Sequence, residues 1–401
     1  MGLFRRVTLF ETGDAMTHIR FRTLSLASLV LCVAATGAVG QTNSPAERRV
    51  AAAQKSIAAR PAHHESYNEL ALALARRARE TADTTYYDRA EEAIRKSLEL
   101  SPGNFEAQKM RTWVLLGKHE FGQALELARA LNKQVPDDLL VYGFLTDAYA
   151  ELGNYEEAEK ACQWMLDLRP GNIPAFTRAA YLRELFGDVE GAIELMRAAY
   201  QRTSPDEVED RAWVLTQLAH LALVAGRIGE AEQILTEALK LVPDYHYAFA
   251  NLARVRSAQG RYPDAADLLT RRYDGAPHPE NLFALAEALE RAGRTAEANA
   301  AYTRFEALAL RESRGWDNAN RELIFYYANH ARRPAEALKI AEMEIARRQD
   351  VYTLDAYAWA LHANARSGEA RRQMDRVLGV GLQDPEVLAR AAIIGNATTN
   401  R

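Results

Sequence analysis

The sequence predicts an all-α protein, an α-solenoid of about nine helical hairpins with a capping helix at each end. Three features recur together: a small residue at a near-constant interval, a glycine about five residues before it in most units, and a proline about twelve residues after it in several. The intervals between the small residues are 34, 34, 34, 39, 34, 33, 39 and 33 positions. These residues are Ala90, Ala124, Ala158, Ala192, Ala231, Ala265, Ala298, Ala337 and Ala370.

Each unit is expected to form two helices of about a dozen residues, because its apolar residues are spaced three and four apart. Gly153 falls where the first helix must end in a left-handed turn, which glycine adopts at the least cost. Ala158 lets the two helices cross closely, and Pro170 stops the second helix because its ring clashes with the preceding turn. One hairpin cannot bury its apolar face alone, so neighbouring units must stack.

The clearest unit, residues 142–170, resembles the tetratricopeptide repeat. Its Tyr142, Leu145, Tyr149, Ala158 and Pro170 occupy the aromatic, Leu, Tyr, Ala and Pro positions of that pattern, while Thr146 and Cys162 depart from it. The resemblance implies a right-handed superhelix in which the first helix of each unit lines a concave groove.

Residues 1–40 have the pattern of a signal peptide. Arg20 and Arg22 precede the apolar run 24–35, and Ala38-Val39-Gly40 supplies small residues for cleavage after Gly40. Met16 is the more natural start, since residues 16–40 alone have the proportions of a secretory signal. We therefore expect an exported protein, either periplasmic or secreted. An uncleaved N-terminal anchor is the alternative.

The mature chain is then expected to divide into a half-repeat helix in 41–63, a repeat array in 64–383 and a capping helix with a tail in 384–401. In the first unit, extra residues at 81–87 are expected to lengthen the turn between the helices. In the last two units, Ala331 and Ala365 stand near the glycine position. Since the array takes up nearly the whole mature chain, no segment remains for a separate catalytic domain.

Two insertions interrupt the period. Residues 203–210 add five positions and are acidic, which predicts a solvated loop in preference to a docking site. The second insertion lies at 311–317, where Trp316 is expected to pack an extended helix pair in preference to anchoring a partner. Both breaks are also candidates for bends that separate three sub-arrays.

The composition excludes several classes of function. The 401 residues are 48% hydrophobic and 26% charged, with a net charge of −4, so no strong field favours nucleic acid or anionic lipid. No stretch of the mature chain approaches the length of a membrane span. Cys162 is the one cysteine beyond the signal segment, which excludes a disulfide framework.

Motifs that carry chemistry are missing from the sequence. It contains no phosphate-binding glycine loop, no HExxH and no GxSxG. His63 and His64 are adjacent, which suits joint metal ligation poorly, and Cys162 stands in a position that packs between helices. We therefore expect no catalytic residue, no metal and no cofactor.

The resemblance implies a binding surface along the first helices, and its exposed positions are rich in aromatic and charged residues that suit an extended peptide or a helix. The predicted function is a non-catalytic scaffold that captures a protein or peptide in the concave groove. Two alternatives stay open: envelope assembly through self-association of the convex or terminal faces, and an enzyme with a site around Glu287, Glu290 and His220. The predicted groove residues are Trp113, Asp147, Tyr181, Trp213, His220, Tyr247, Arg254, Phe283, Glu287, Tyr326 and Trp359, flanked by Glu184, Glu290, Asn329, Asp355 and His362.

Overall fold

The computed structural model describes residues 44–315 and 318–399, and these residues form helices joined by short turns, without a strand. They make nine consecutive helical hairpins, preceded by one helix and followed by another. The all-α solenoid is therefore confirmed. The predictions on the signal segment 1–40 and on Trp316 lie outside the described residues.

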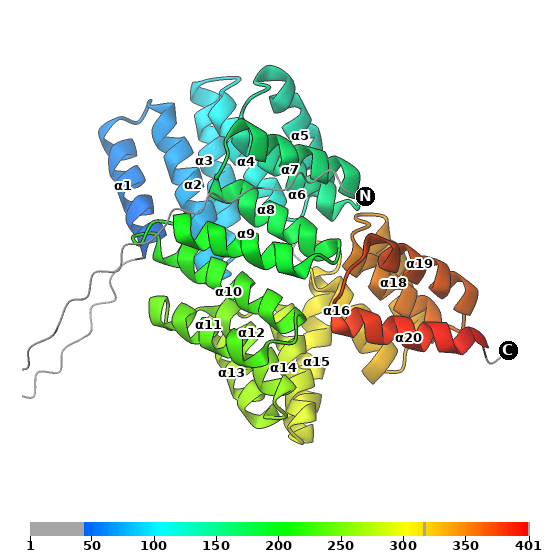
Figure 1. Cartoon of the computed structure of the whole chain (residues 1–401). Helices are drawn as coiled ribbons and strands as arrows, with labels where there is room; N and C mark the ends of the chain where they lie inside the picture. Colours follow the sequence, from blue (N-terminus) through cyan, green and yellow to red (C-terminus); the bar gives the residue numbers. More distant parts are fainter. Residues whose placement is uncertain (1–43, 316–317, 400–401) are drawn as a thin grey trace, which may run out of the picture.

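Figure 1 shows three groups of helices, separated at the two insertions. In the N-terminal array, α1–α9, the helices lie side by side across the upper part of the molecule. Helix α1 is the predicted half-repeat, and the next eight helices pair in sequence. The bounds are α1 Pro45–Ala59, α2 His64–Thr81, α3 Thr85–Leu100, α4 Phe105–Gly117, α5 Phe121–Gln134, α6 Leu139–Glu151, α7 Tyr155–Leu168, α8 Ile173–Leu185 and α9 Val189–Arg202.

The central array, α10–α15, lies below the first group in the same view, and the C-terminal array, α16–α20, lies to its right (Figure 1). The central helices are α10 Val208–Val224, α11 Ile228–Leu241, α12 His246–Ala258, α13 Tyr262–Gly275, α14 Pro279–Arg291 and α15 Thr295–Glu312. The C-terminal array contains α16 Asn320–Phe325, the π-helical turn η1 Tyr326–His330, α17 Pro334–Ile345, α18 Val351–Ala363, α19 Ser367–Val380 and α20 Pro385–Thr399.

The turn inside each hairpin has the predicted left-handed residue. Gly153 and Gly260, for example, have φ values of +77° and +73°. In the last two units the position is taken by Arg332 and Ala365, at φ +53° and +57°. Ala365 itself takes the position, and Ala331 stands one residue before it, because the π-helical turn just before Ala331 extends the first helix of that unit.

The extra residues of the first unit do not form a long turn. Helix α2 continues to Thr81 and α3 starts at Thr85, so that both helices are longer than in the next unit. The predicted lengthening of this turn is therefore wrong. The extra residues instead extend the helices on both sides of the left-handed Ala82, since each added residue gains a hydrogen bond once a helix has formed.

The acidic insertion also differs from the prediction of a solvated loop. Residues from Val208 extend α10 by a turn, and the insertion folds back onto α1 and α2. Glu207 pairs with Arg49 at 2.5 Å, Arg79 pairs with Asp210 at 2.5 Å, and Arg79 also pairs with Glu209. Arginines of α1 and α2 therefore face the carboxylates of the insertion, and the attraction between these opposite charges holds the insertion against α1 and α2.

The C-terminal array packs against the turns of the third and fourth hairpins. The Val351 N–H donates to Tyr155 Oη at 2.8 Å, and Arg348 approaches Glu151 at 3.8 Å. A hydrophobic cluster joins Leu182 and Leu185 of α8 to Val351 and Leu354 of α18. The C-terminal array is thus folded back onto the N-terminal array, as the central array is through the acidic insertion.

Candidate binding site

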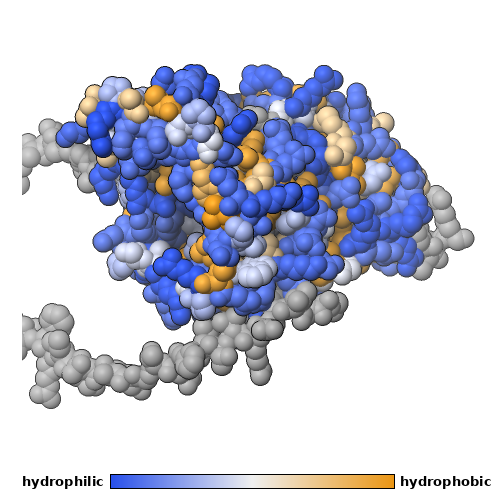
Figure 2. Space-filling view, turned by 90° about the horizontal axis from the view of Figure 1, so that it is seen from above, coloured by the Kyte–Doolittle hydropathy of each residue, from blue (hydrophilic) through white to orange (hydrophobic). Residues whose placement is uncertain are grey.

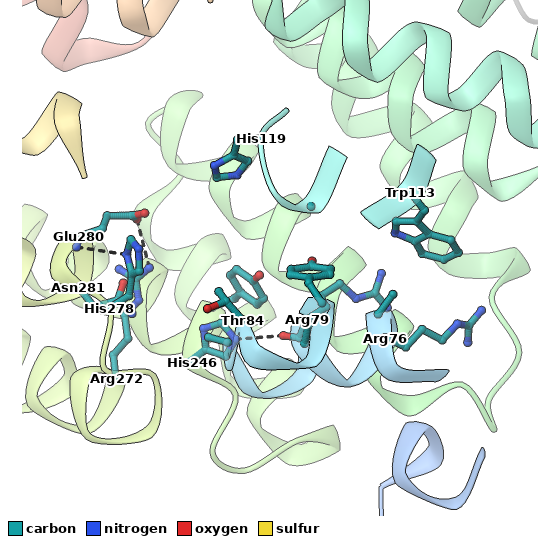
Figure 3. A pocket seen from close by; sticks show the side chains of 16 residues that line it. Arg76, Arg79, Thr84, Trp113, His119, His246, Arg272, His278, Glu280 and Asn281 are labelled. Carbon is teal, nitrogen blue, oxygen red and sulfur yellow. Dashed lines mark hydrogen bonds and ion pairs between the residues drawn. The ribbon is translucent and has the colours of Figure 1, made fainter. Parts of the chain in front are cut away.

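A cavity of about 370 Å³ lies on the concave side, where the first helices of units 1 and 2 face those of units 6 and 7. Helices α2 and α4 form one wall, and α12 and α14 form the other, as Figure 3 shows. His119, in the turn between α4 and α5, lies at one side of the space. Residues distant in sequence meet here only because the central array folds back toward α2.

Aromatic rings cover part of the cavity wall. Trp113 of α4, Tyr87 of α3 and Tyr247 of α12 line it. The ring of Tyr247 lies against the His246 imidazole, with the ring centroids 3.9 Å apart. Trp113 also packs against the hydrophobic clusters of the first three units. The wall therefore offers flat apolar surface to a ligand.

The charges around the cavity are balanced. Arg76 lies 3.7 Å from Glu207, Arg79 pairs with Glu209 and Asp210, and Arg272 lies 3.5 Å from Glu280. Burial lowers the pKa of Arg79, but the neighbouring carboxylates outweigh burial and hold it above its ordinary value. The arginines therefore stay charged, and their charge is met by carboxylates of the chain itself.

His246 is a neutral group in this wall. Its side chain is only 6% exposed, and burial lowers its pKa to about 4. Its Nε2 lies 3.3 Å from the carbonyl oxygen of Arg79, which can only accept, so Nε2 carries the proton and Nδ1 is an acceptor. Nδ1 is buried and has no hydrogen-bond partner among the described residues.

A second cavity of about 720 Å³ adjoins the first. Both are lined by Ala82, Thr84 and His278. The second extends between the end of α2 and the segment Gly275–Pro279, toward Arg311 at the end of α15. Together the two cavities form a channel between the N-terminal and central arrays.

Two of the predicted groove residues, Trp113 and Tyr247, line this channel. Two others lie elsewhere and contact each other: His220 Nε2 lies 2.6 Å from Glu184 Oε1, and Arg254 Nη1 lies 2.8 Å from His220 Nδ1. This chain of polar contacts crosses α8, α10 and α12, with His220 and Arg254 at equivalent positions of their units. Its side chains are therefore engaged with one another along the array.

Other predicted residues serve packing. Phe283 and Tyr326 are only 6% and 9% exposed and belong to one hydrophobic cluster, so their expected exposure in a groove is wrong. The π-helical turn at Tyr326 and the neighbouring Phe305 explain this burial, since the Phe305 ring meets Tyr326 edge to face and lies tilted against Phe283. Tyr181 and Trp213 are half-buried against a large hydrophobic cluster.

Polar contacts within the chain occupy Asp147 and Trp359. Asp147 Oδ2 lies 2.6 Å from Arg178 Nη2 of the next unit, and Trp359 Nε1 donates to Asn329 Oδ1 at 2.7 Å. The flanking Asp355 is buried and pairs with Arg390, while His362 stacks on Trp359.

The cluster considered for catalysis is divided in the structure. Glu287 and Glu290 lie 3.7 and 3.2 Å from His330, whereas His220 contacts Glu184. Burial raises the pKa of the Cys162 thiol to about 12, as suits a packed thiol. Within residues 44–315 and 318–399, no three His, Cys, Asp or Glu side chains are placed to hold a metal ion.

The repeat pattern gave no indication of four residues that line the cavity: Arg79, His246, Arg272 and Glu280. The repeat pattern assigns them no special position, since Arg79 lies near the end of the first helix α2 and Arg272 belongs to a second helix. One signal was present: the acidic insertion at 203–210 carries charges opposite to the Arg76–Arg79 segment.

No helix in the described part of the chain has the length and apolarity needed to cross a membrane. Figure 2 shows one face of the molecule. Where grey atoms do not cover it, this face is largely hydrophilic, with separate hydrophobic patches.

Comparisons with known proteins agree with the fold. Two family models described as tetratricopeptide repeat match residues 109–173 and 222–273. No protein with a curated description matches the sequence. The human IFIT1 dimer with PPP-AAAA aligns over 79% of this chain and 90% of its own, at 12% identity and a TM-score of 0.52. The human IFIT1 dimer with m7Gppp-AAAA aligns over 79% and 81%, at 14% identity and a TM-score of 0.50.

A third solved structure, the APC/C hetero-tetramer Cut9–Hcn1, aligns over 81% of this chain at 12% identity and a TM-score of 0.47. The chain spans 55% of that protein's length. At 12% and 14% identity, the two IFIT1 structures show the fold alone. The two family matches fall inside an array that repeats the same hairpin nine times, and the chain is therefore a tetratricopeptide repeat protein, with the architecture of a protein-interaction scaffold.

Proposed function

We propose that this protein is an exported, non-catalytic scaffold that captures a protein partner by a peptide segment laid in the channel between its N-terminal and central arrays. The observation that carries the proposal is the cavity of about 370 Å³, whose wall combines aromatic rings with polar groups. Ligand sites typically have volumes of roughly 300–1,000 Å³ and this mixed lining. Trp113 and Tyr247, both predicted as groove residues, lie in that wall.

The charge balance favours a peptide over a nucleic acid. The IFIT1 structures contain PPP-AAAA and m7Gppp-AAAA, which carry several phosphates. In this chain, Arg76, Arg79 and Arg272 each approach a carboxylate of the protein itself. A polyphosphate would have to displace those carboxylates, whereas a peptide main chain would not.

Export is proposed from the sequence of residues 1–40. Mass spectrometry of the protein from its own cells is expected to find an N-terminus at Gln41. An N-terminus at Met1 or Met16 on the mature protein would contradict signal cleavage.

Partner capture is tested with Trp113→Ala. Loss of an aromatic anchor in a binding site typically costs about 2 kcal/mol or more, so the affinity for a captured partner is expected to fall roughly 30-fold. The matched control is Trp164→Ala, since Trp164 lies on α7, 52% exposed and outside the cavity. Partners captured from an envelope extract and identified by mass spectrometry provide the ligand for titration. Equal affinity of both variants would contradict the proposal, and circular dichroism checks that helicity is kept.

Self-association is the second candidate, because α20 ends the described array with Leu388 and Ile393 exposed at 38% and 49%. Light scattering over a range of concentrations separates the two functions. A defined oligomer without ligand, abolished by Ile393→Glu, would favour assembly over capture.

A further inference from the structure

We propose that the cavity between α2 and α12 recognises the main chain of a peptide together with one aromatic side chain. The peptide carbonyl accepts from Arg79 or Arg272, and a peptide N–H donates to His246. This inference rests on the proposed function and locates the subsite where the captured segment is held.

The first argument is a set of unpaired polar atoms in one wall. Arg79 Nε, Arg272 Nε and His246 Nδ1 are buried and have no hydrogen-bond partner among the described residues. All three residues line the same cavity. A buried polar group without a partner costs about 1–3 kcal/mol, so several of them around one space indicate a ligand that satisfies them.

The second argument is the chemistry of these atoms. The two guanidinium Nε–H groups donate, and the neutral imidazole accepts through Nδ1 because Nε2–H is directed at the Arg79 carbonyl. A ligand that satisfies both kinds must itself carry an acceptor and a donor. A peptide unit does so, with its C=O and N–H, whereas a carboxylate or a phosphodiester has no donor for His246.

The third argument is electrostatic. Arg79 pairs with Glu209 and Asp210, and Arg272 approaches Glu280 at 3.5 Å. Glu209 is held further by Tyr245, whose Oη donates to it at 2.7 Å. These carboxylates balance the charge of the guanidinium groups, and the two Nε–H groups are left without a partner among the described residues. A neutral ligand therefore fits better than an anion.

The aromatic rings define the second part of the ligand. Trp113, Tyr87 and Tyr247 provide flat surfaces in the same cavity, against which an aromatic side chain packs with little loss of entropy. Figure 3 shows Trp113 on one side of Arg79 and the group of Glu280, His278 and Arg272 on the other. The three unpaired atoms are covered by neighbouring side chains, so binding requires side-chain rotations, which are common at binding sites.

The probe for this subsite is N-acetyl-tryptophanamide, which carries a peptide unit and an indole ring. Its affinity is compared with that of indole, which lacks the main chain, and of inorganic phosphate. In protein with ¹⁵N-labelled histidine, we expect the Nδ1 resonance of His246 to move with N-acetyl-tryptophanamide and to stay in place with indole. We also expect N-acetyl-tryptophanamide to bind at least tenfold more tightly than indole.

Two pairs of measurements make the test specific. In His246→Phe, the tenfold preference for N-acetyl-tryptophanamide over indole is expected to disappear, because the acceptor is lost. Thr84→Trp fills the cavity and is expected to lower the affinity for both probes at least tenfold. Thr84 is well suited, since its side chain makes no capping hydrogen bond. Thr85→Trp is the matched control, because Thr85 is exposed and does not line the cavity.

Several results would overturn the inference: equal affinities for the amide and indole, unchanged binding in Thr84→Trp, or phosphate binding that displaces N-acetyl-tryptophanamide. Thermal melts show whether each variant folds. If a natural partner binds Thr84→Trp as well as the unmodified protein, the subsite is wrong but partner capture stands. If the probe binds as expected and no partner is ever captured, the proposed function fails and the subsite stands.

Discussion

The hairpin turns of the N-terminal and central arrays have the same conformation and different surroundings. Gly153 and Gly187 have φ of +77° and +82°, and Gly226 and Gly260 have +74° and +73°. A Cβ built on Gly153 would lie 2.5 Å from the Gln349 carbonyl oxygen, and one on Gly187 would lie 2.5 Å from that of Gly381. At Gly226 and Gly260 a Cβ would meet nothing within 4 Å.

The difference separates two reasons for a glycine at this position. In the central array the residue is needed for the left-handed turn alone. In the third and fourth hairpins it also lets the backbone of the C-terminal array approach closely. The repeat therefore supplies identical turns, and the closure of the molecule gives two of them a second role.

The largest effect is expected where the C-terminal array is held together. Arg390 Nη2 lies 2.6 Å from Asp355 Oδ2, and Asp355 is only 2% exposed. Arg390→Ala leaves that carboxylate buried without its partner, which typically costs about 3–5 kcal/mol. Hydrogen exchange is expected to show faster exchange in α18 and α20, and then in Gly381, which contacts the turn at Gly187.

Two further variants control this experiment. Arg376→Ala, on the exposed side of α19, is expected to leave exchange in α20 unchanged. Replacing both partners, in Arg390→Met with Asp355→Leu, is expected to restore most of the stability. A loss below about 1 kcal/mol in Arg390→Ala would show that the pair does not hold the array together.

The glycine comparison itself is tested with alanine. Gly260→Ala is expected to cost about 1–2 kcal/mol for the left-handed conformation. Gly153→Ala and Gly187→Ala are expected to lose the same stability and about 1–3 kcal/mol more, because the added methyl group overlaps a backbone carbonyl. Urea unfolding of the four variants, with Gly226→Ala as the second control, measures the difference. Equal losses at all four positions would mean that the docked arrangement is not the stable one.

A smaller, pH-dependent effect is expected at the same docked surface. Burial and the nearby Asp350 raise the pKa of Glu151 from 4.5 to about 7, against the opposing charges of Arg348 and Arg321. Between these values the folded state binds more protons than the unfolded state, so stability falls as the pH rises from 4.5 to 7. The slope is at most about 1.4 kcal/mol per pH unit for one group.

Glu151→Gln removes this titration. The free energy of unfolding of this variant is expected to vary less between roughly pH 5 and pH 8 than that of the unmodified protein, and to exceed it at the higher pH. Thermal melts at these two pH values measure the difference. A steeper dependence in the variant would contradict the assignment.

The smallest effect is expected at the exposed end of the acidic insertion. Glu207 pairs with Arg49, and their side chains are 33% and 43% exposed. Glu207→Ala is expected to cost about 0–1 kcal/mol, since solvent screens such pairs. Glu209→Ala is the sharper comparison, because it also removes the acceptor of the buried Tyr245 hydroxyl. If the two variants lose equal stability, the insertion does not hold the arrays together through Glu209.

Much of the fold was predictable because its causes are local. The helix starting at Pro45, the left-handed turns at Gly153 and Gly260, and the packing of Cys162 all follow from patterns within one unit. The candidate site was predictable only in part. Trp113 and Tyr247 were found because they occupy the expected face of a first helix, whereas Arg79 and His246 became partners through closure.

The sequence by itself determined the hairpin, its period, its turns and the number of units, because each depends on residues a few positions apart or on the adjacent repeat. The tertiary structure decided which surfaces meet. Small rotations accumulate from unit to unit along the array. Only their combined effect brings α2 to face α12 and Gly153 to lie close to Gln349. It also buried Phe283 and Tyr326, although Tyr326 stands at the same position of its unit as Trp113, which lines the cavity. The repeat pattern is the same in every unit, so it cannot specify contacts between units that are distant in the sequence. Those contacts depend on where in the array each unit stands.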